Sequence, residues 1–512
     1  MINSPERFFF CRLFLSTCCL LAPAADCAAG PLAIAYAGIV APGTGGKTFY
    51  SSVLPYNPVA NGDSVVFEHY TTDFKYGLWR WQNGSLSKII YSGEPIPGVA
   101  GTNFSSVNEF TLNDAGRVAF STLRALTIET PGGLETIAKK EDLAPGGGNG
   151  KFYTFRDLTF AADGQVSFRA QLTGGSTNFG VWRGSTTGIQ AVAVDGQVLA
   201  GGQTITSTSS SAPPAAGSGS TALEAGLNPG GLNATIRQTS TTAPQIVVLE
   251  GQHAPGLTTE TFFSFLDVTG NNAGQLAFRA SLVDGPVHNA IFRDSGSGPQ
   301  FLVGNESPMP GPVGARLAGL GDPVLNEAGI VAFWGYLSAF SVPSGTGTTG
   351  LWTIDPAGLI HEIAREKTLV PGLTGVHFGN LIGVDFQMND TDQIAWHGSI
   401  TGLNVNSNND KGIWATDRAG NLVTIVREGD SVEVLPGVFR TVRTIDFSDS
   451  SFSNGATSAW TDDQLLVYKL TFTDSTSGIF VSSVPEPAGL ALGGVALLAL
   501  LAIRRWRGAK PA

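Results

Sequence analysis

The sequence predicts an all-β fold, a β-propeller of eight four-stranded blades (or seven as the alternative), followed by a C-terminal transmembrane helix. Three observations predict the propeller. A short turn-and-strand motif recurs along the chain, each copy is accompanied by three further strand-like runs, and the two ends of the repeated part complement each other. The copies recur roughly every 40–70 residues, a period typical of propeller blades rather than of the shorter coils of a solenoid.

The motif starts with a turn of the form Asn-x-x-Gly and continues into a short apolar strand that ends on Ala-Phe. The Gly accepts a positive φ that other residues resist, and we expect the Asn side chain to bond the backbone two residues on. The best copies are Asn113–Phe120, Asn271–Phe278 and Asn326–Phe333, and Asn389–Trp396 and Ala161–Phe168 are weaker ones. The predicted turn residues are Asn113, Gly116, Asn271, Gly274, Asn326 and Gly329.

Each copy is followed by a Gly-apolar-Trp/Phe element, an apolar run and a loop that usually contains Pro-Gly. An aromatic-containing run then leads into the next turn, which gives four strands for each unit. Four tryptophans occupy the same place in this pattern, and we expect them to pack in the core rather than to stack on a ligand. They are Trp79, Trp182, Trp352 and Trp414.

Eight strands are counted at the position of the motif Phe, three of them degenerate. They contain Phe67, Phe120, Phe168, Thr235, Phe278, Phe333, Trp396 and Val467, and those at Phe67, Thr235 and Val467 are the degenerate ones. The last unit stops at Gly478–Ser482 without its final apolar run, and the segment 32–38 supplies such a run at the other end. We therefore predict that the N-terminal strand completes the last blade, which removes exposed sheet edges.

Three parts follow from this organisation. Residues 1–29 read as a signal peptide, 30–483 as the propeller and 484–512 as a sorting and anchor segment. An uncharged stretch at 488–503 is the predicted transmembrane helix, and Arg504, Arg505 and Arg507 form the cytoplasmic basic stop. The low-complexity segment Ser207–Thr221 is predicted to be a flexible loop inside one blade.

Composition excludes several functions. All four cysteines lie in residues 1–29, so the exported part has no disulfide, no thiol nucleophile and no Cys-bound metal. The net charge of −11 argues against a general nucleic-acid surface. The six histidines have no metal-site spacing, and no catalytic constellation is found. Calcium at Asp390 and Asp392 or near Asp410 is the one cofactor considered, but these residues have a sufficient role as turn formers.

The tail resembles the PEP-CTERM sorting signal, in which Pro485, Glu486 and Pro487 match the motif. That resemblance implies an exosortase-type processing protease as partner, transient anchoring in the inner membrane, and then the cell surface or extracellular space. The repeats are similar to the tandem N-x-x-G-x-x-A-F family, whose members carry varied C-terminal anchors. Neither resemblance implies a ligand or an activity, although the sorting family is associated with surface and exopolysaccharide matrices.

The function expected is that of an exported, envelope-sorted module that binds or scaffolds exopolysaccharide or surface proteins, without a cofactor and without enzymatic activity. The alternative is a propeller enzyme that acts on glycans or lactones at the central channel. A cluster of polar or acidic side chains at the centre of the ring would distinguish the two.

Overall fold

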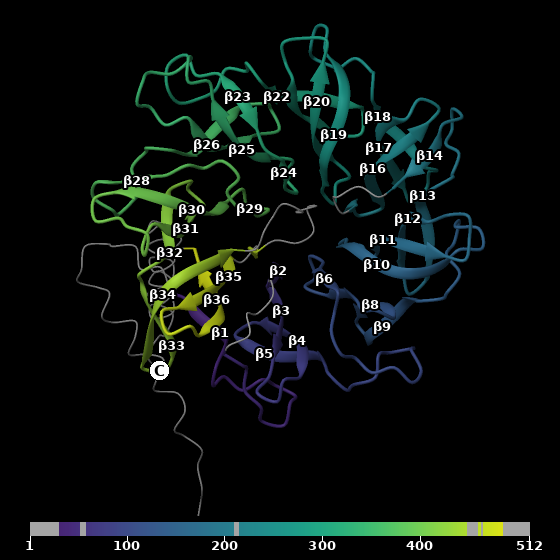
Figure 1. Cartoon of the computed structure of the whole chain (residues 1–512), viewed down its shortest axis with the longest axis horizontal. Coiled ribbons are helices and arrows are strands. Elements are labelled where there is room, and N and C mark those ends of the chain that lie inside the picture. The colour runs from purple at the N-terminus through teal and green to yellow at the C-terminus, as the bar shows by residue number, and fades with distance from the viewer. Residues whose placement is uncertain (1–29, 52–57, 209–213, 448–458, 462–463, 485–512) are drawn as a thin grey trace, which may run out of the picture.

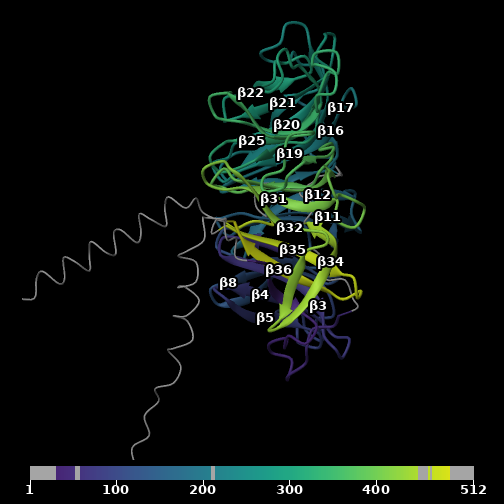
Figure 2. The ribbon, with the colours of Figure 1, turned by 90° about the vertical axis from the view of Figure 1, so that its left-hand side faces the viewer.

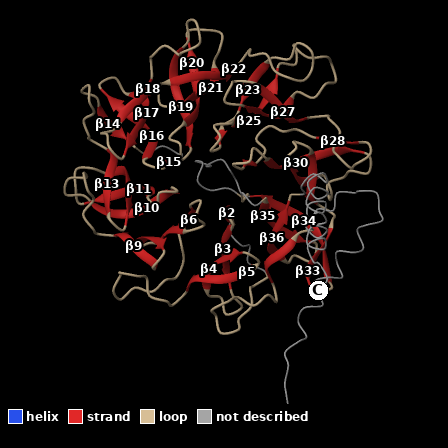
Figure 3. Cartoon of the chain, turned by 180° about the vertical axis from the view of Figure 1, so that it is seen from behind, coloured by secondary structure: helices blue, strands red, loops and turns tan. Residues whose placement is uncertain are grey.

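The computed structural model describes residues 30–51, 58–208, 214–447, 459–461 and 464–484. Its strands form eight antiparallel sheets arranged around a central axis (Figure 1). The side view shows the ring as a disc, and the view from behind shows strands joined by loops in every blade (Figures 2 and 3). The prediction of an all-β propeller is confirmed, and the blade number is eight rather than seven.

Blades are numbered in chain order, and the inner strand, which lies nearest the axis, is a single strand in blades 1, 2, 3 and 5 and is divided into two short strands in blades 4, 6 and 7 (Figure 1). Blade 1 contains β2 (Val59–Asn61), β3 (Ser64–Tyr70), β4 (Tyr76–Gln82) and β5 (Ser85–Tyr91). Blade 2 contains β6 (Glu109–Leu112), β7 (Val118–Ser121), β8 (Ala125–Thr130) and β9 (Gly133–Lys139). Blade 3 contains β10 (Lys151–Phe160), β11 (Val166–Thr173), β12 (Phe179–Ser185) and β13 (Gly188–Val194). Blade 4 contains β14 (Thr204–Ser207), β15 (Ala215–Gly217), β16 (Ser220–Asn228), β17 (Leu232–Thr239) and β18 (Gln245–Leu249).

The second half of the ring repeats this plan. Blade 5 contains β19 (Thr261–Gly270), β20 (Leu276–Val283), β21 (Asn289–Asp294) and β22 (Pro299–Gly304). Blade 6 contains β23 (Leu317–Leu320), β24 (Val324–Leu325), β25 (Val331–Leu337), β26 (Thr349–Ile354) and β27 (Ile360–Arg365). Blade 7 contains β28 (Val376–Phe378), β29 (Phe386–Met388), β30 (Ile394–Gly402), β31 (Lys411–Thr416) and β32 (Leu422–Arg427). Blade 8 contains β33 (Ser431–Leu435), β34 (Val438–Phe447), β35 (Leu465–Phe472), β36 (Ser477–Ser483) and the N-terminal β1 (Leu32–Tyr36).

The N-terminal strand closes the ring. Strand β1 pairs antiparallel with β36, with Leu32 opposite Val481 and Tyr36 opposite Gly478. The hydroxyl of Tyr36 also bonds that of Thr476 at 2.8 Å, which joins residues 440 positions apart. The predicted closure is confirmed, and it gives the otherwise free edge of β36 a partner.

The Asn-x-x-Gly turns have the predicted backbone but a different hydrogen bond. Gly116, Gly274 and Gly329 have φ values of 67°, 76° and 80°. The Asn271 Oδ1 accepts from the N–H of Gln275, four residues on rather than two, and the same bond occurs at Asn113 and Asn326. The longer reach is required because the turn has three residues between the Asn and the residue that re-enters the ladder.

These asparagines also connect neighbouring blades. The Nδ2 of Asn271 donates to the carbonyl of Asn326 at 3.0 Å, and the Nδ2 of Asn326 donates to the carbonyl of Asn389 at 3.2 Å. All three side chains are buried. A buried amide needs both its oxygen and its nitrogen satisfied, and here the turn and the next blade together do so.

Stacked aromatic pairs fill the blades. Phe168 on β11 lies 6.2 Å from Trp182 on β12, and Phe333 pairs with Trp352 in the same way at 6.1 Å. The Gly two residues before each Trp is required sterically, since a Cβ at Gly180 would lie 2.6 Å from the Trp182 ring. The prediction that Trp79, Trp182, Trp352 and Trp414 belong to the core is confirmed, because all four are fully buried.

Two degenerate copies were assigned wrongly. Thr235 lies on β17, the third strand of blade 4, and the position of the motif Phe is taken by Leu223 on β16. In blade 8 that position is Tyr468, one residue after Val467, because Tyr468 pairs with Phe480. A hydrophobic residue other than Phe fits these sites, so local pattern alone could not set the register.

The low-complexity segment is also more ordered than predicted. Ala215–Gly217 and Ser220–Thr221 pair as β15 and the start of β16, so they are strand rather than loop. Small side chains suit this place because a Cβ at Gly217 would lie 2.0 Å from the carbonyl of Asn271 in blade 5. The predicted signal peptide, the motif Pro485–Pro487, the helix at 488–503 and the arginines after it lie outside the described residues. Among the residues that are described, no helix is long and apolar enough to cross a membrane.

Candidate functional site

One position in every blade departs from the apolar repeat. It is the residue directly after the motif aromatic on the second strand, which pairs with the apolar residue before the Trp. The residue at this position differs from blade to blade. In seven blades it is polar or charged, and in blade 6 it is a tryptophan. In chain order the eight residues are Glu68, Ser121, Arg169, Glu224, Arg279, Trp334, His397 and Lys469. A charge enclosed within a blade interface costs free energy, so this position calls for an explanation beyond packing.

A second set of acids lies on the inner strands or in the segments directly beside them. Each stands four residues before the first residue of the turn, and the five members are Glu109, Asp157, Asp267, Asp322 and Asp385. Asp157 and Asp267 have φ values of 53° and 50° at bulges where β10 and β19 lose register with their neighbours. These acids were not predicted from the sequence, because the copies of the motif were compared only from the first residue of the turn onward. Extending the comparison of copies four residues upstream would have revealed them.

The two sets meet between blades 2, 3 and 4. The Glu109 carboxylate accepts from the backbone N–H groups of Asp157 and Leu158 at 2.6 and 2.7 Å. Asp157 in turn forms an ion pair with Arg169, whose Nε donates to the carbonyl of Thr208 at 2.8 Å. Burial raises the pKa of Glu109 to about 7. A continuous polar path therefore crosses two blade interfaces.

The path continues through blades 4, 5 and 6. The Asp267 carboxyl interacts electrostatically with the carboxyls of both Glu224 and Asp322. Arg279 Nε lies 2.6 Å from Asp322 Oδ1. Burial, followed by the neighbouring acid, raises the pKa of both Glu224 and Asp267 to about 7. Titratable groups shifted in this way cluster at functional sites more often than elsewhere.

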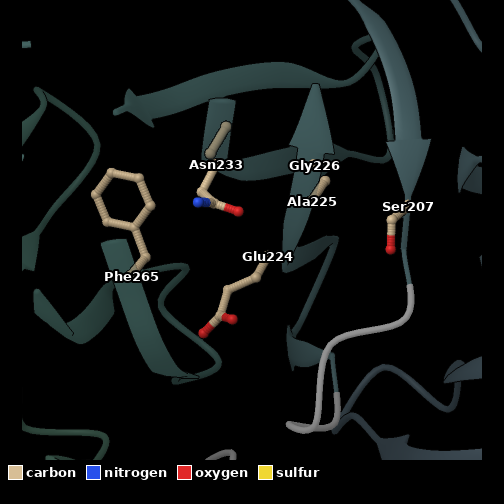
Figure 4. Close-up of a pocket in the computed structure, with 7 residues that line it drawn as sticks. Ser207, Glu224, Ala225, Gly226, Asn233 and Phe265 are labelled. Atoms are coloured by element: carbon tan, nitrogen blue, oxygen red, sulfur yellow. The ribbon is translucent and has the colours of Figure 1, made fainter. Parts of the chain in front are cut away.

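A cavity of about 210 Å³ opens beside Glu224 (Figure 4). Its lining comes from three strands of blade 4 and from the inner strand of blade 5, and consists of Ser207, Glu224, Ala225, Gly226, Asn233, Ala234 and Phe265. The inner strand of blade 4 is divided into β14 and β15 beside this cavity, as it also is in blades 6 and 7, whereas β10 of blade 3 is continuous. In the close-up, the Glu224 carboxyl and the Asn233 amide extend into the same space (Figure 4).

The chemistry offered there is hydrogen bonding to a polar molecule. Glu224 Oε1 is buried and has no hydrogen-bond partner among the described residues. Asn233 is held by Glu250, which accepts from its backbone N–H and from its Nδ2 at 2.8 and 2.9 Å. An acceptor without a donor at the wall of a cavity is suited to a hydroxyl or amine of a ligand.

The profile of one protein family, a family of unknown function (DUF7453), matches residues 28–125 and 121–491. The chain belongs to the DUF7453 family. No curated protein matches the chain in sequence. The match covers all eight blades of this DUF7453 propeller, so the inner polar path and the cavity lie inside the family region.

Solved structures resemble this DUF7453 propeller only distantly. A puromycin-hydrolysing peptidase from Mycobacterium tuberculosis is 14% identical, with a TM-score of 0.37, over 87% of this chain and 61% of its own. This chain therefore spans less than two thirds of that peptidase. The WD40 domain of SCAP from fission yeast is 10% identical, with a TM-score of 0.36, over 86% and 95% of the two chains. Saccharomyces cerevisiae Sqt1 is 10% identical, with a TM-score of 0.38, over 86% and 98%. These likenesses carry no argument about function.

The residues considered for calcium have structural contacts. Asp390 Oδ1 accepts from the backbone N–H of Glu327 at 3.0 Å, and Asp392 Oδ1 accepts from Asn326 Nδ2 at 2.8 Å. Within the described part of the chain, no group of three or more His, Cys, Asp or Glu side chains is arranged to hold a metal ion. The turn residues Asn113, Asn271 and Asn326 connect blades, and none of the predicted turn residues lines the cavity beside Glu224.

Proposed function

We propose that the protein is an exported, envelope-sorted propeller that binds hydroxyl-rich matrix material, such as exopolysaccharide, through the cavity beside Glu224. The observation that carries the proposal is the buried Glu224 Oε1, which has no hydrogen-bond partner among the described residues and lies at the wall of that cavity. Sugars present dense hydroxyl donors, and a carboxylate with an amide beside it is a suitable acceptor set.

Comparison between blades supports this reading. Glu68 occupies the same repeat position in blade 1 as Glu224 does in blade 4. Glu68 is only 8% exposed and does not line the cavity. Of these two equivalent glutamates, Glu224 therefore lines this cavity and Glu68 does not.

This comparison provides the experiment. The full chain, purified in detergent, is tested for retention on immobilised extracellular polysaccharide and on a glycan array. We expect Glu224→Gln to weaken retention about tenfold or more, because a charged hydrogen bond is lost, and Glu68→Gln to leave it unchanged. Equal retention by the two variants would overturn the proposed site.

Sorting belongs to the same proposal. The resemblance of the tail to the PEP-CTERM signal supports processing by an exosortase-type protease after transient anchoring in the inner membrane. Replacing Pro485, Glu486 and Pro487 together should leave unprocessed protein in the inner membrane, as judged by fractionation and immunoblotting. Normal release of that variant would show that the tail does not act through the motif.

The second candidate is an enzyme that acts on glycans or lactones. The neighbouring carboxyls of Asp267 and Asp322 favour it, because burial raises the pKa of Asp267 and an acid with a raised pKa beside a second carboxyl is suited to general acid–base catalysis. For this candidate, Asp322→Asn should abolish release of reducing ends or opening of a lactone while ligand retention remains. Absence of any turnover by the wild-type protein would reject it.

A further inference from the structure

A second cavity, of about 360 Å³, lies between blades 3 and 4 and has a buried arginine at its wall. Its lining is polar apart from Ile189 and comprises Gln165, Arg183, Ser185, Thr187, Gly188, Ile189, Gln190 and Ser240. Ligand pockets span about 300–1,000 Å³, so this cavity suits a molecule the size of one sugar ring rather than a chain. It shares no residue with the cavity beside Glu224.

Arg183 is 2% exposed and is only partly satisfied. Its Nε donates to Gln165 Oε1 at 3.0 Å, and its Nη2 contacts Asp163 Oδ2 at 2.5 Å and the carbonyl of Gly217 at 3.1 Å. Its Nη1 is buried without a hydrogen-bond partner among the described residues. Leaving such a donor unpaired costs about 1–3 kcal/mol in proteins generally, so a partner is expected.

The equivalent arginine of blade 5 shows what is missing. Arg293 follows Phe292 as Arg183 follows Trp182, and its Nη1 donates to the carbonyl of Gly329 at 2.8 Å. Its Nη2 donates at 2.9 Å to the carbonyl of Pro356, which lies in the β26–β27 turn of blade 6. The corresponding β17–β18 turn of blade 4 contributes only Ser240 to the cavity and makes no bond to Arg183. The carbonyl that Pro356 of the neighbouring blade supplies to Arg293 thus has no counterpart at Arg183, where the cavity lies instead.

The ligand's chemistry follows from the groups presented. The oxygen of Gln165 is taken by Arg183 Nε, so the NH₂ end of that amide is left for a ligand. With Arg183 Nη1 this gives a donor-rich cavity, which suits an anionic acceptor without donors of its own, such as a carboxylate. The surrounding hydroxyls of Ser185, Thr187 and Ser240 suit the hydroxyl groups of a sugar ring.

We propose that this cavity binds the carboxylate of an acidic sugar, with Arg183 as the group that receives it. This inference rests on the proposed function and deepens it, because it names uronic acids as the residues of the matrix material that are recognised. Free sugar acids and uronic-acid polymers share this chemistry, and the experiment separates them.

The test is calorimetric titration of the full chain, purified in detergent, with D-glucuronate, D-glucose and polygalacturonate. We expect glucuronate to bind, glucose to bind at least about tenfold more weakly, and Arg183→Gln to weaken glucuronate about tenfold to a hundredfold. Arg293→Gln is the matched control, because it removes the same kind of blade contact away from the cavity, and it should bind as wild type does. A response to polygalacturonate but not to glucuronate would place recognition on the polymer rather than on one residue and would overturn this form of the proposal.

A second variant covers the case in which Arg183→Gln fails to fold. Gln190→Trp fills the cavity from an exposed position on β13, and we expect it to abolish glucuronate binding with an unchanged melting temperature. Equal binding of glucose and glucuronate, or an equal loss in Arg293→Gln, would reject the carboxylate site. Neither result touches the Glu224 experiment, so failure here and failure of the proposed function are distinguishable.

Discussion

The side-chain Nδ2 of Asn272 donates a 2.7 Å hydrogen bond to Oδ2 of Asp114, which joins the turn of blade 5 to the turn of blade 2 across the axis of the ring. The same Nδ2 lies 2.9 Å from Glu327 Oε1 in blade 6. Burial and the nearby carboxylates of Asp390 and Asp114 raise the pKa of Glu327. The neutral amide of Asn272 thus lies between Asp114 of blade 2 and Glu327 of blade 6, two acids whose blades are not neighbours.

Replacing that amide by a carboxylate should destabilise the ring. Asn272→Asp removes the donor and adds a like charge, so we expect a loss of about 1–3 kcal/mol in the free energy of unfolding at pH 8. The loss should shrink at pH 5, where the carboxyls take up protons. Urea denaturation at the two pH values measures it, with Asn272→Ala as the control that removes the donor without adding charge. A larger loss at pH 5 than at pH 8 would contradict this account.

The turn glycine of blade 5 tests the backbone requirement. Gly274 has a φ of 76°, and the nearest atom to a Cβ there is Ser220 Oγ at 3.7 Å, so space is available and only conformation is restrictive. Gly274→Val should cost about 1–2 kcal/mol or more, because a β-branched residue resists positive φ. Gly274→Asn, which tolerates this region, should cost clearly less. An unchanged melting temperature for the Val variant would count against the turn as described.

The glycine before each Trp tests a steric requirement instead. A Cβ at Gly180 would lie 2.6 Å from the ring of Trp182, in a strand where φ is not positive. We therefore expect Gly180→Ala to cost about 1–3 kcal/mol through overpacking. Gly132→Ala, where the nearest atom is 3.5 Å away, is the matched control and should be close to neutral. Chemical denaturation measures the free energy of unfolding of both variants, and equal stability of the two would refute the steric explanation.

Stability should depend on pH in a direction set by the buried acids. Burial raises the pKa of Glu68 to about 8 and those of Glu109, Glu224 and Asp267 to about 7. The folded state therefore binds protons more readily than the unfolded state does between the ordinary carboxyl pKa and these values. The free energy of unfolding should accordingly rise by at least about 1 kcal/mol as the pH falls from 8.5 to about 6.

Two histidines oppose this trend at lower pH. Burial lowers the pKa of His69 to about 4 and also lowers that of His397, so the folded state resists their protonation. Stability from this source is lost as the pH falls from about 6.5 toward 4, which predicts a shallower rise below pH 6.5 than the acids alone would give. Glu224→Gln should flatten the alkaline side of the curve, and Glu224→Gln with an unaltered curve would show that this acid is not responsible.

Much of the fold could be predicted because each blade repeats its own local chemistry. The positive φ at Gly274, the buried Trp182 and the role of the first strand all follow from a motif and its period. Blade 4 was harder to assign, because Leu223 replaces the motif Phe and Gly-rich and Ser-rich residues hide its inner strand. The candidate site was missed for a different reason: Glu224 and Glu68 occupy one repeat position, but only Glu224 lines this cavity, together with residues of other strands. Such a difference arises from contacts between segments distant in the chain, which no local pattern records.

The bond between Tyr36 and Thr476 has a consequence for how the molecule is made. Strand β1, the outer strand of blade 8, is synthesised first and has no partner until β36 is made, so seven blades can assemble while the eighth is still incomplete. Contacts so remote in sequence are slow to find one another. Pairing of β1 with β36 is thus the step that closes the ring. A cut or a tether near either strand should open the ring at blade 8 and leave the other blades intact.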